Sequence, residues 1–169
     1  LKNLEKEEFI VTNIKKSVRK KQPAPPFTTS TLQQEASRRL SFNARRTMKA
    51  AQELYEGVEI EDLGAVGLIT YMRTDSLRIS AEAQAAARAY LTEKYGAEYV
   101  PEKPREYKSR AGAQDAHEAV RPANVALTPA EVKDSLTPHQ FKLYKLIYER
   151  FIASQMSEMQ YETNTVTFD

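Results

Sequence analysis

The chain has 169 residues, of which 41% are hydrophobic, and its formal net charge is only +2. This length can bury one substantial core, so we expect one domain with an appendage. The absence of cysteine excludes disulfides and thiolate metal sites, and the two histidines argue against an all-protein zinc site. No apolar run reaches the roughly 18–20 residues that cross a bilayer, and the polar opening LKNLEKEE is no signal peptide, so we expect a soluble protein.

The two ends of the chain carry strand patterns. Residues 8–18 alternate partly between β-branched and polar residues, and the proline-rich stretch KQPAPPF that comes next predicts a stiff connector. The final stretch MQYETNTVTFD predicts a second strand, with Val166 and Phe168 on one face and Tyr161, Thr163, Thr165 and Thr167 on the other. Two terminal strands that flank a helical region are typical of a domain inserted into a neighbour that contains a sheet. The sequence opens on Leu1 and stops within a predicted strand, which suggests a piece of a longer protein. We therefore divide it into 1–26, 27–157 and 158–169.

The middle of the chain is predicted to be helical, which makes the fold mainly α. A first helix would begin at Ser30 or Thr31 and a second near residues 41–43, ending at Gly57; together they resemble a helix-turn-helix unit. A third helix would run from its cap at Ser80 to Gly96. Residues 97–127 are predicted to be mainly loop, and two last helices would begin at Thr128-Pro129 and Thr137-Pro138, the second being apolar enough to lie in the core.

Positive charge is concentrated in two clusters although the net charge is small. The first comprises five basic residues within seven, and the second lies between Glu35 and Glu53 with no acid inside it; the members are Lys15, Lys16, Arg19, Lys20 and Lys21, and Arg38, Arg39, Arg45, Arg46 and Lys49. Clusters of this kind attract polyanions, although a solvated surface is the simpler explanation of either cluster taken alone.

The stretch GLITYMRTDS, residues 67–76, holds a candidate nucleophile. Residues 68–72 predict a short strand, in which Tyr71 and Arg73 would share a face. A free phenol has a pKa near 10 and is only about 0.1% ionised at pH 7, so it needs a positive neighbour to become a nucleophile. Arg73 could supply that charge, and a guanidinium suits a phosphodiester better than a carbonyl.

A second polar stretch is AQDAHEAVRP, residues 113–122. If it formed a helical turn, His117 and Arg121 would share a face. An imidazole beside a guanidinium suits phosphoryl transfer. The acids Glu61 with Asp62, and Asp115 with Glu118, match no metal motif, so we assign no metal site.

Taken together, GLITYMRTDS, AHEAVRP and the preceding PAPPFTTSTLQQEASRRL resemble the bacterial type IA DNA topoisomerases, in the topoisomerase I branch. The resemblance covers essentially the whole chain, and the three blocks occur in the family's order. Met72 and HEAVRP favour that branch, while Val120 and Ala123 depart mildly from its commoner isoleucine and threonine.

The resemblance implies a role for each site residue. Tyr71 would attack a phosphorus of single-stranded DNA and form a 5′-phosphotyrosyl link. A second strand would pass through the protein-bridged gap before religation, which relaxes negative supercoils. Arg73 would contact the scissile phosphate, and His117 would donate a proton or hydrogen bond. Asp75 would orient Arg73 or His117 or contact DNA, and Arg121 would either bind DNA or serve a structural pairing.

The resemblance also implies what lies outside the chain. The family holds Mg²⁺ in an acidic toprim domain that this sequence does not match, so we expect no cofactor here and magnesium in the parent enzyme, a bacterial protein of the cytoplasm and nucleoid. The chain would be the helical domain with the nucleophile, flanked by strands of the arch domain. Alone it would bind DNA weakly and not cleave it.

Three alternatives remain. A non-catalytic helix-turn-helix DNA-binding module over residues 31–56 explains the arginines but leaves Tyr71 without a role. A tyrosine recombinase uses the same residue types, but its tyrosine comes after the histidine and arginine, whereas Tyr71 precedes His117. A protein-interaction scaffold would show no DNA binding at low salt.

Overall fold

The computed structural model describes residues 9–108 and 117–168, which fall into two compact units. The first unit consists of residues 9–22 and 158–168, and the second of Pro23–Ser157. The regular elements of both units are four α-helices, two short 3₁₀ helices and four strands in two small antiparallel sheets, so among the described residues the fold mixes α and β more than the sequence predicted. None of the described helices is long and apolar enough to span a membrane.

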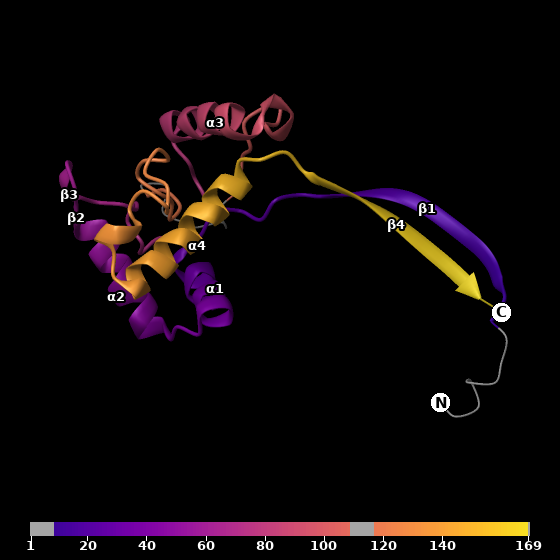
Figure 1. The fold of residues 1–169 in the computed structure, drawn as a ribbon, viewed down its shortest axis with the longest axis horizontal. Coiled ribbons are helices and arrows are strands. Elements are labelled where there is room, and N and C mark those ends of the chain that lie inside the picture. The colour runs from indigo at the N-terminus through magenta and orange to yellow at the C-terminus, as the bar shows by residue number, and fades with distance from the viewer. Residues whose placement is uncertain (1–8, 109–116, 169) are drawn as a thin grey trace. The chain divides into compact units, whose positions relative to one another are not determined.

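The first unit is a two-stranded antiparallel ribbon of β1 (Val11–Lys21) and β4 (Met159–Phe168) (Figure 1). The first strand was predicted at residues 8–18, and the regular pairing in fact continues to Lys21, where the prolines next in the chain end it. The pairing sets Ile14 opposite Val166 and Arg19 opposite Tyr161, which confirms the predicted alternation of faces in the last strand.

The second unit is built on α1 (Thr29–Leu40), α2 (Ala44–Glu56), α3 (Ala81–Tyr95) and α4 (Pro138–Ser154), with α4 in contact with both α1 and α2 (Figure 1). The last helix buries eight of its residues, as its apolar sequence predicted. Its largest fully buried side chains, Tyr144 and Phe151, join Phe27, Leu32 and Leu54 in one core.

Most helix ends obey their local capping signals. Asn43 and Ser80 cap α2 and α3, and Gly57 and Gly96, both at positive φ, end them as predicted. The first helix instead begins earlier than predicted, because Thr28 and Thr31 exchange the reciprocal bonds of a capping box and Thr28 becomes the cap.

The helix predicted at Thr128-Pro129 does not form. The Glu131 carboxylate does accept a bond from the Thr128 backbone, 2.7 Å away, but only turns and the 3₁₀ helix Lys133–Ser135 come after it. The next cap, Thr137, lies nine residues beyond Thr128 and precedes Pro138, which leaves too little length for a stable helix.

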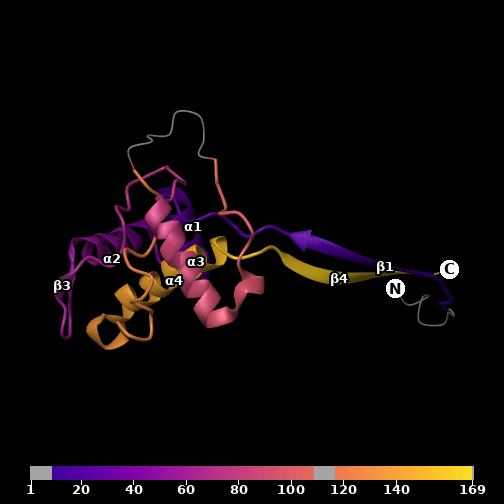
Figure 2. The ribbon, with the colours of Figure 1, turned by 90° about the horizontal axis from the view of Figure 1, so that it is seen from above.

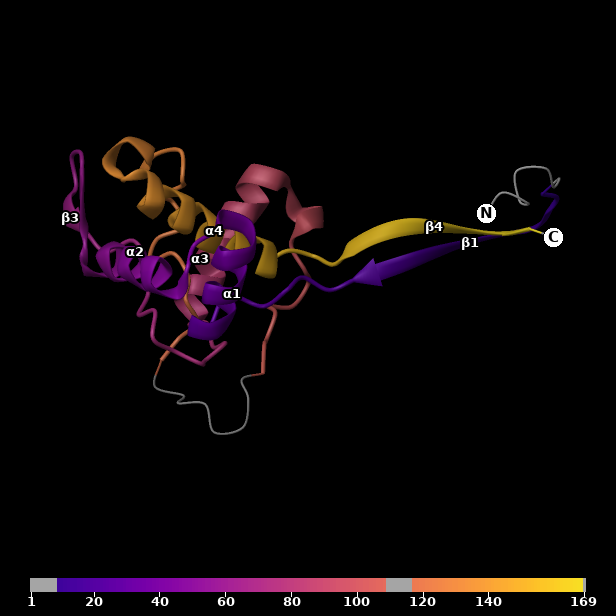
Figure 3. The ribbon, with the colours of Figure 1, turned by 90° about the horizontal axis from the view of Figure 1, so that it is seen from below.

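A small hairpin that the sequence did not reveal comes directly after α2. Its strands are β2 (Val58–Ile60) and β3 (Gly64–Val66), and it extends beyond the C-terminal end of α2 (Figure 2 and Figure 3). Asp62 in its turn and Gly64 at the start of β3 both take positive φ. The hairpin returns the chain to the end of α2, from which residues 67–76 cross the unit.

Candidate active site

The segment that carries Tyr71 is extended, but it is not a strand. Its one ladder contact is an isolated bridge between Ile69 and Pro122, and residues 72–73 already bend. The strand predicted over residues 68–72 is therefore wrong. The segment meets another part of the chain at one bridge and does not pair along a neighbouring strand.

Hydrogen bonds on both sides hold this segment in place. Before Tyr71, the Leu68 amide donates to the Leu54 carbonyl at 2.7 Å and the Thr70 amide to the Arg121 carbonyl at 2.9 Å. After it, the Thr29 hydroxyl donates to the Met72 carbonyl at 2.8 Å. Tyr71 is thus fixed between the start of α1, the end of α2 and the stretch that contains Arg121.

A close approach of backbones anchors the segment to α2. A Cβ at Gly67 would lie 2.8 Å from the carbonyl oxygen of Tyr55, so only glycine fits there without a shift of the helix end. This approach brings the Tyr55 ring to the Tyr71 ring, with a centroid separation of 5.5 Å and an interplanar angle of 65°. Edge-to-face pairs of this kind are favourable and orient the ring.

On its other side the half-buried Tyr71 meets His117. The ring centroids lie 5.2 Å apart at an angle of 40°, so the structure brings together the predicted nucleophile and the predicted proton donor although they are 46 positions apart in the sequence. The phenol oxygen of Tyr71 makes no hydrogen bond with any residue of the described ranges, which leaves it available for an incoming group.

Arg73 and Asp75 are both exposed. Within residues 9–108 and 117–168, neither takes part in a recorded ion pair, so the predicted orientation of Arg73 or His117 by Asp75 stays a prediction. Asp75 lines a cavity of about 330 Å³ beside the start of α1, together with Pro25, Pro26, Thr28, Ser30, Thr31, Leu77 and Arg150.

No helical turn forms within residues 117–122, where Val120 and Pro122 make isolated bridges, so His117 and Arg121 do not share a face in the way a helical turn would give. Their environments also differ: His117 is half-buried against Tyr71, whereas Arg121 is 9% exposed.

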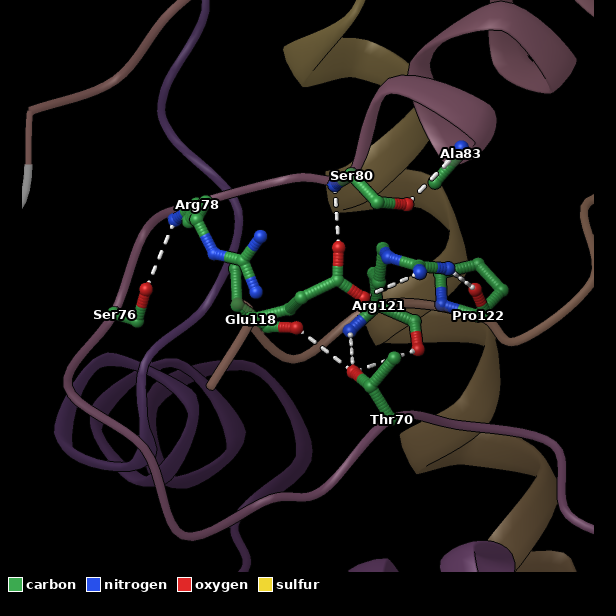
Figure 4. A network of polar contacts seen from close by, with 9 residues as sticks. Thr70, Ser76, Arg78, Ser80, Ala83, Glu118, Arg121 and Pro122 are labelled. Carbon is green, nitrogen blue, oxygen red and sulfur yellow. Dashed lines mark hydrogen bonds and ion pairs between the residues drawn. The ribbon is translucent and has the colours of Figure 1, made fainter. Parts of the chain in front are cut away.

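Arg121 lies in a polar network that joins the two stretches (Figure 4). Its Nη2 donates to Glu118 Oε2 at 2.5 Å and its Nη1 to the Pro122 carbonyl at 2.9 Å. Its backbone amide donates to the hydroxyl of Thr70 at 3.0 Å, and that hydroxyl donates in turn to the Ala119 carbonyl at 2.7 Å. The guanidinium therefore has a structural partner, although its predicted contact with DNA is untested.

Glu118 extends the network to α3. Its Oε1 accepts the backbone amide of Ser80, the residue whose hydroxyl caps α3 through the Ala83 amide at 3.3 Å (Figure 4). The Ala119 amide also donates to the Arg78 carbonyl at 2.9 Å. Glu118 thus links the position of His117 to the beginning of a helix. Sequence reasoning treated it only as a possible metal ligand.

The acids of the chain do not form a metal centre where the structure describes them. Residues 9–108 and 117–168 contain no group of three or more His, Asp or Glu side chains placed to hold an ion. Glu118 is engaged with Ser80 and Arg121, and Glu61 and Asp62 lie in the hairpin turn. Asp115 lies outside the described residues. A catalytic Mg²⁺, which the family resemblance implies, does not fit this donor set and would need other ligands.

The helix-turn-helix-like pair α1 and α2 presents the second basic cluster. Arg38 and Arg39 both reach the carboxylate of Glu35, at 2.5 and 3.9 Å, and the Arg46 guanidinium lies over the Phe42 ring, 5.5 Å from its centroid. The Arg38 bond lowers the pKa of Glu35, so that acid stays ionised and offsets part of the positive charge. This pairing weakens the reading of the unit as a dedicated DNA-binding module.

Comparison with known proteins agrees with these residues. The model of a family described as DNA topoisomerase matches residues 1–169. Among solved structures, full-length topoisomerase I from Thermotoga maritima is 46% identical, with a TM-score of 0.85 over 99% of this chain. The chain spans 26% of the length of that protein. The chain accordingly belongs to the bacterial type IA DNA topoisomerase family.

Proposed function

We propose that this chain is the segment of a DNA topoisomerase that carries the nucleophile, and that Tyr71 is that nucleophile. The observation that carries the proposal is the contact of the Tyr71 ring with His117, in a segment of a topoisomerase family that also exposes Arg73. The phenol oxygen would attack a backbone phosphorus of single-stranded DNA. The bond from phosphorus to the 3′ oxygen breaks, leaving a 5′-phosphotyrosyl link and a free 3′-hydroxyl.

The charge of the reaction is met by neighbouring residues. Arg73 binds the non-bridging phosphate oxygens, where a guanidinium forms paired charge-assisted bonds and stabilises the negative charge of the transition state. His117 donates a hydrogen bond or proton beside the reacting phenol. Religation reverses the step: the 3′-hydroxyl attacks the phosphorus and the tyrosine leaves. One phosphodiester replaces another of similar energy, so the cycle needs no nucleotide. Passage of a second strand between cleavage and religation relaxes negative supercoils.

The fixed backbone around Tyr71 serves this chemistry. The bonds from Leu68, Thr70 and Thr29 hold the segment in one position before DNA arrives, so little ordering remains at the moment of attack. The ribbon would belong to the arch domain, and the partners of the chain would be the other domains of the parent, among them a toprim domain that holds Mg²⁺.

The test uses the complete topoisomerase that contains this chain and a single-stranded oligonucleotide labelled at one end. A 3′ label should remain on the denatured protein and a 5′ label should not, because the link is to the 5′ phosphate. Tyr71→Phe should abolish the adduct. Tyr55→Phe is the matched control, since Tyr55 lies against Tyr71 and should leave the adduct intact. An adduct in Tyr71→Phe, or one that retains the 5′ label, contradicts the proposal.

The isolated 169-residue chain should bind DNA weakly and should not cleave it, because the rest of the site lies elsewhere. Incubation of the chain with labelled single-stranded DNA and Mg²⁺ checks this expectation. Any cleaved product that disappears in Tyr71→Phe would show that the chain is competent by itself.

A further inference from the structure

The ribbon of β1 and β4 has two chemically different faces. Residues directly opposite each other in an antiparallel pair point to the same side, so the register assigns every side chain to a face. One face carries Ile14, Lys16, Val18 and Lys20 of β1 and Gln160, Glu162, Asn164 and Val166 of β4. The other, which we name the cationic face, consists of Asn13, Lys15, Ser17, Arg19 and Lys21 of β1 and Met159, Tyr161, Thr163, Thr165 and Thr167 of β4.

The cationic face carries no acid. The two glutamates of the ribbon lie away from it, because Glu162 is opposite Val18 and Glu158 pairs with Lys20 at 2.6 Å. Within the described residues, Lys15, Arg19 and Lys21 therefore form no ion pair, and all three are exposed. Sorting of the acids to one side leaves an uncompensated row of positive charge on the other.

The dimensions and side chains of this face suit a nucleic acid strand. From Lys15 to Lys21 the strand extends about 20 Å, which is long enough to span several phosphates of a DNA strand. Tyr161 lies directly opposite Arg19 and is 39% exposed. An exposed aromatic ring beside cations is the usual means of stacking a base of a single strand. The exposed Thr165 and Thr167 present further hydrogen-bond donors on this face, whereas the Thr163 hydroxyl is bonded to Ser17.

We propose that the cationic face binds single-stranded DNA, with Lys15, Arg19 and Lys21 on phosphates and Tyr161 stacked on a base. The proposal rests on the proposed function in taking DNA as the substrate, and it adds a binding surface that is separate in sequence from the nucleophile. Recognition is by charge and stacking, so it does not depend on DNA sequence.

The ribbon offers a matched pair of variants for the test. Lys15→Gln with Lys21→Gln removes two charges from the cationic face, and Lys16→Gln with Lys20→Gln removes two from the opposite face. Binding of the 169-residue chain to a labelled single strand is measured by fluorescence anisotropy between 25 and 200 mM salt. The first pair should flatten the slope of log K against log salt by about 1.4, and the second should leave it nearly unchanged. Equal effects of the two pairs, or no effect of the first, would overturn the proposal.

Stacking is tested at Tyr161. Tyr161→Leu should weaken single-strand binding by roughly 5- to 150-fold and leave duplex binding unchanged, whereas Tyr161→Phe keeps the ring and should bind normally. An equal loss on duplex, or in Tyr161→Phe, would overturn the stacking. The two proposals can fail separately. If Tyr71 forms the adduct but the two lysine double variants have the same salt dependence of binding, only the cationic face is refuted. If the lysine variants behave as predicted but Tyr71 forms no adduct, only the role of Tyr71 as the nucleophile is refuted.

Discussion

Two arginines of the site should respond in opposite ways to the same substitution. The sequence left open whether Arg121 binds DNA or is a structural residue, and the structure buries its side chain to 11% exposure beside Glu118 at 18%. Arg73 is exposed and unpaired with any residue that the structure describes. Arg121→Met retains the length of the side chain but removes every charge and donor. We expect it to destabilise the fold, while Arg73→Met should not.

The loss of unfolding free energy in Arg121→Met follows from the contacts that the substitution removes. Breaking a buried ion pair costs about 3–5 kcal/mol, and the lower end applies because both side chains keep some contact with water. Loss of the bond to the Pro122 carbonyl adds about 1 kcal/mol. Against this, Nε of Arg121 is buried without a hydrogen-bond partner among the described residues, and its removal returns about 1–2 kcal/mol. The net loss is about 2–3 kcal/mol, which for a chain of this size lowers Tm by roughly 4–12 °C.

The two variants are compared by thermal unfolding of the chain and by adduct formation in the complete topoisomerase well below its Tm. Arg121→Met should melt earlier and still form the adduct in the cold. Arg73→Met should change Tm by no more than about 2 °C and lose the adduct, because an exposed side chain contributes little to stability. A normal Tm in Arg121→Met together with a loss of DNA binding would refute the structural role.

Three further substitutions test the elements that support the site. Gly67→Ala should destabilise the chain by about 1–3 kcal/mol, seen as a lower urea midpoint at constant m, because its Cβ meets the Tyr55 carbonyl; an unchanged midpoint would exclude the close approach. Tyr144→Phe should lose about 1 kcal/mol near neutral pH with its bond to the Leu127 carbonyl at 2.6 Å. Burial raises the pKa of Tyr144, so the free energy of unfolding of the wild type should fall as pH rises above about 10. In Tyr144→Phe it should fall less over the same range, as unfolding curves at each pH would show. Asn43→Ala removes the cap of α2 and should lower stability by about 1 kcal/mol in the same measurement, and no change would contradict the capping role.

Local signals in the sequence predicted most of the helices, because capping depends on neighbouring residues. Ser80 and Gly96 bound α3 as expected, since each acts within one turn of its own position. Thr128-Pro129 carries the same signal as Thr137-Pro138, but only the second begins an α-helix. The two segments differ in the residues after the cap, because α4 has an apolar face to bury in the core, whereas the earlier segment ends at the next cap.

The candidate site could be predicted only in part from the residues. The chemistry of the residues and the family resemblance both point to Tyr71 and His117, and the structure brings their rings together. Their contact depends on Thr70 and Arg121, which bind each other across 51 residues, and no local pattern signals such a pairing. The helical turn expected between His117 and Arg121 is absent from residues 117–122, the described part of that stretch, because backbone bonds and bridges to partners far along the chain hold them instead.

The structure separates the fixed parts of this site from the parts that remain free. Backbone bonds from Leu68, Thr70 and Thr29 hold the Tyr71 segment in place, but the Arg73 side chain has no partner among the described residues. Ordering an arginine side chain costs up to about 2 kcal/mol, and a paired bond to a phosphate returns more than that. A DNA phosphate that supplies the missing partner would therefore order Arg73 only when the scissile group is present. The nucleophile would be held ready in advance, and the charge that makes it reactive would be assembled by the substrate itself.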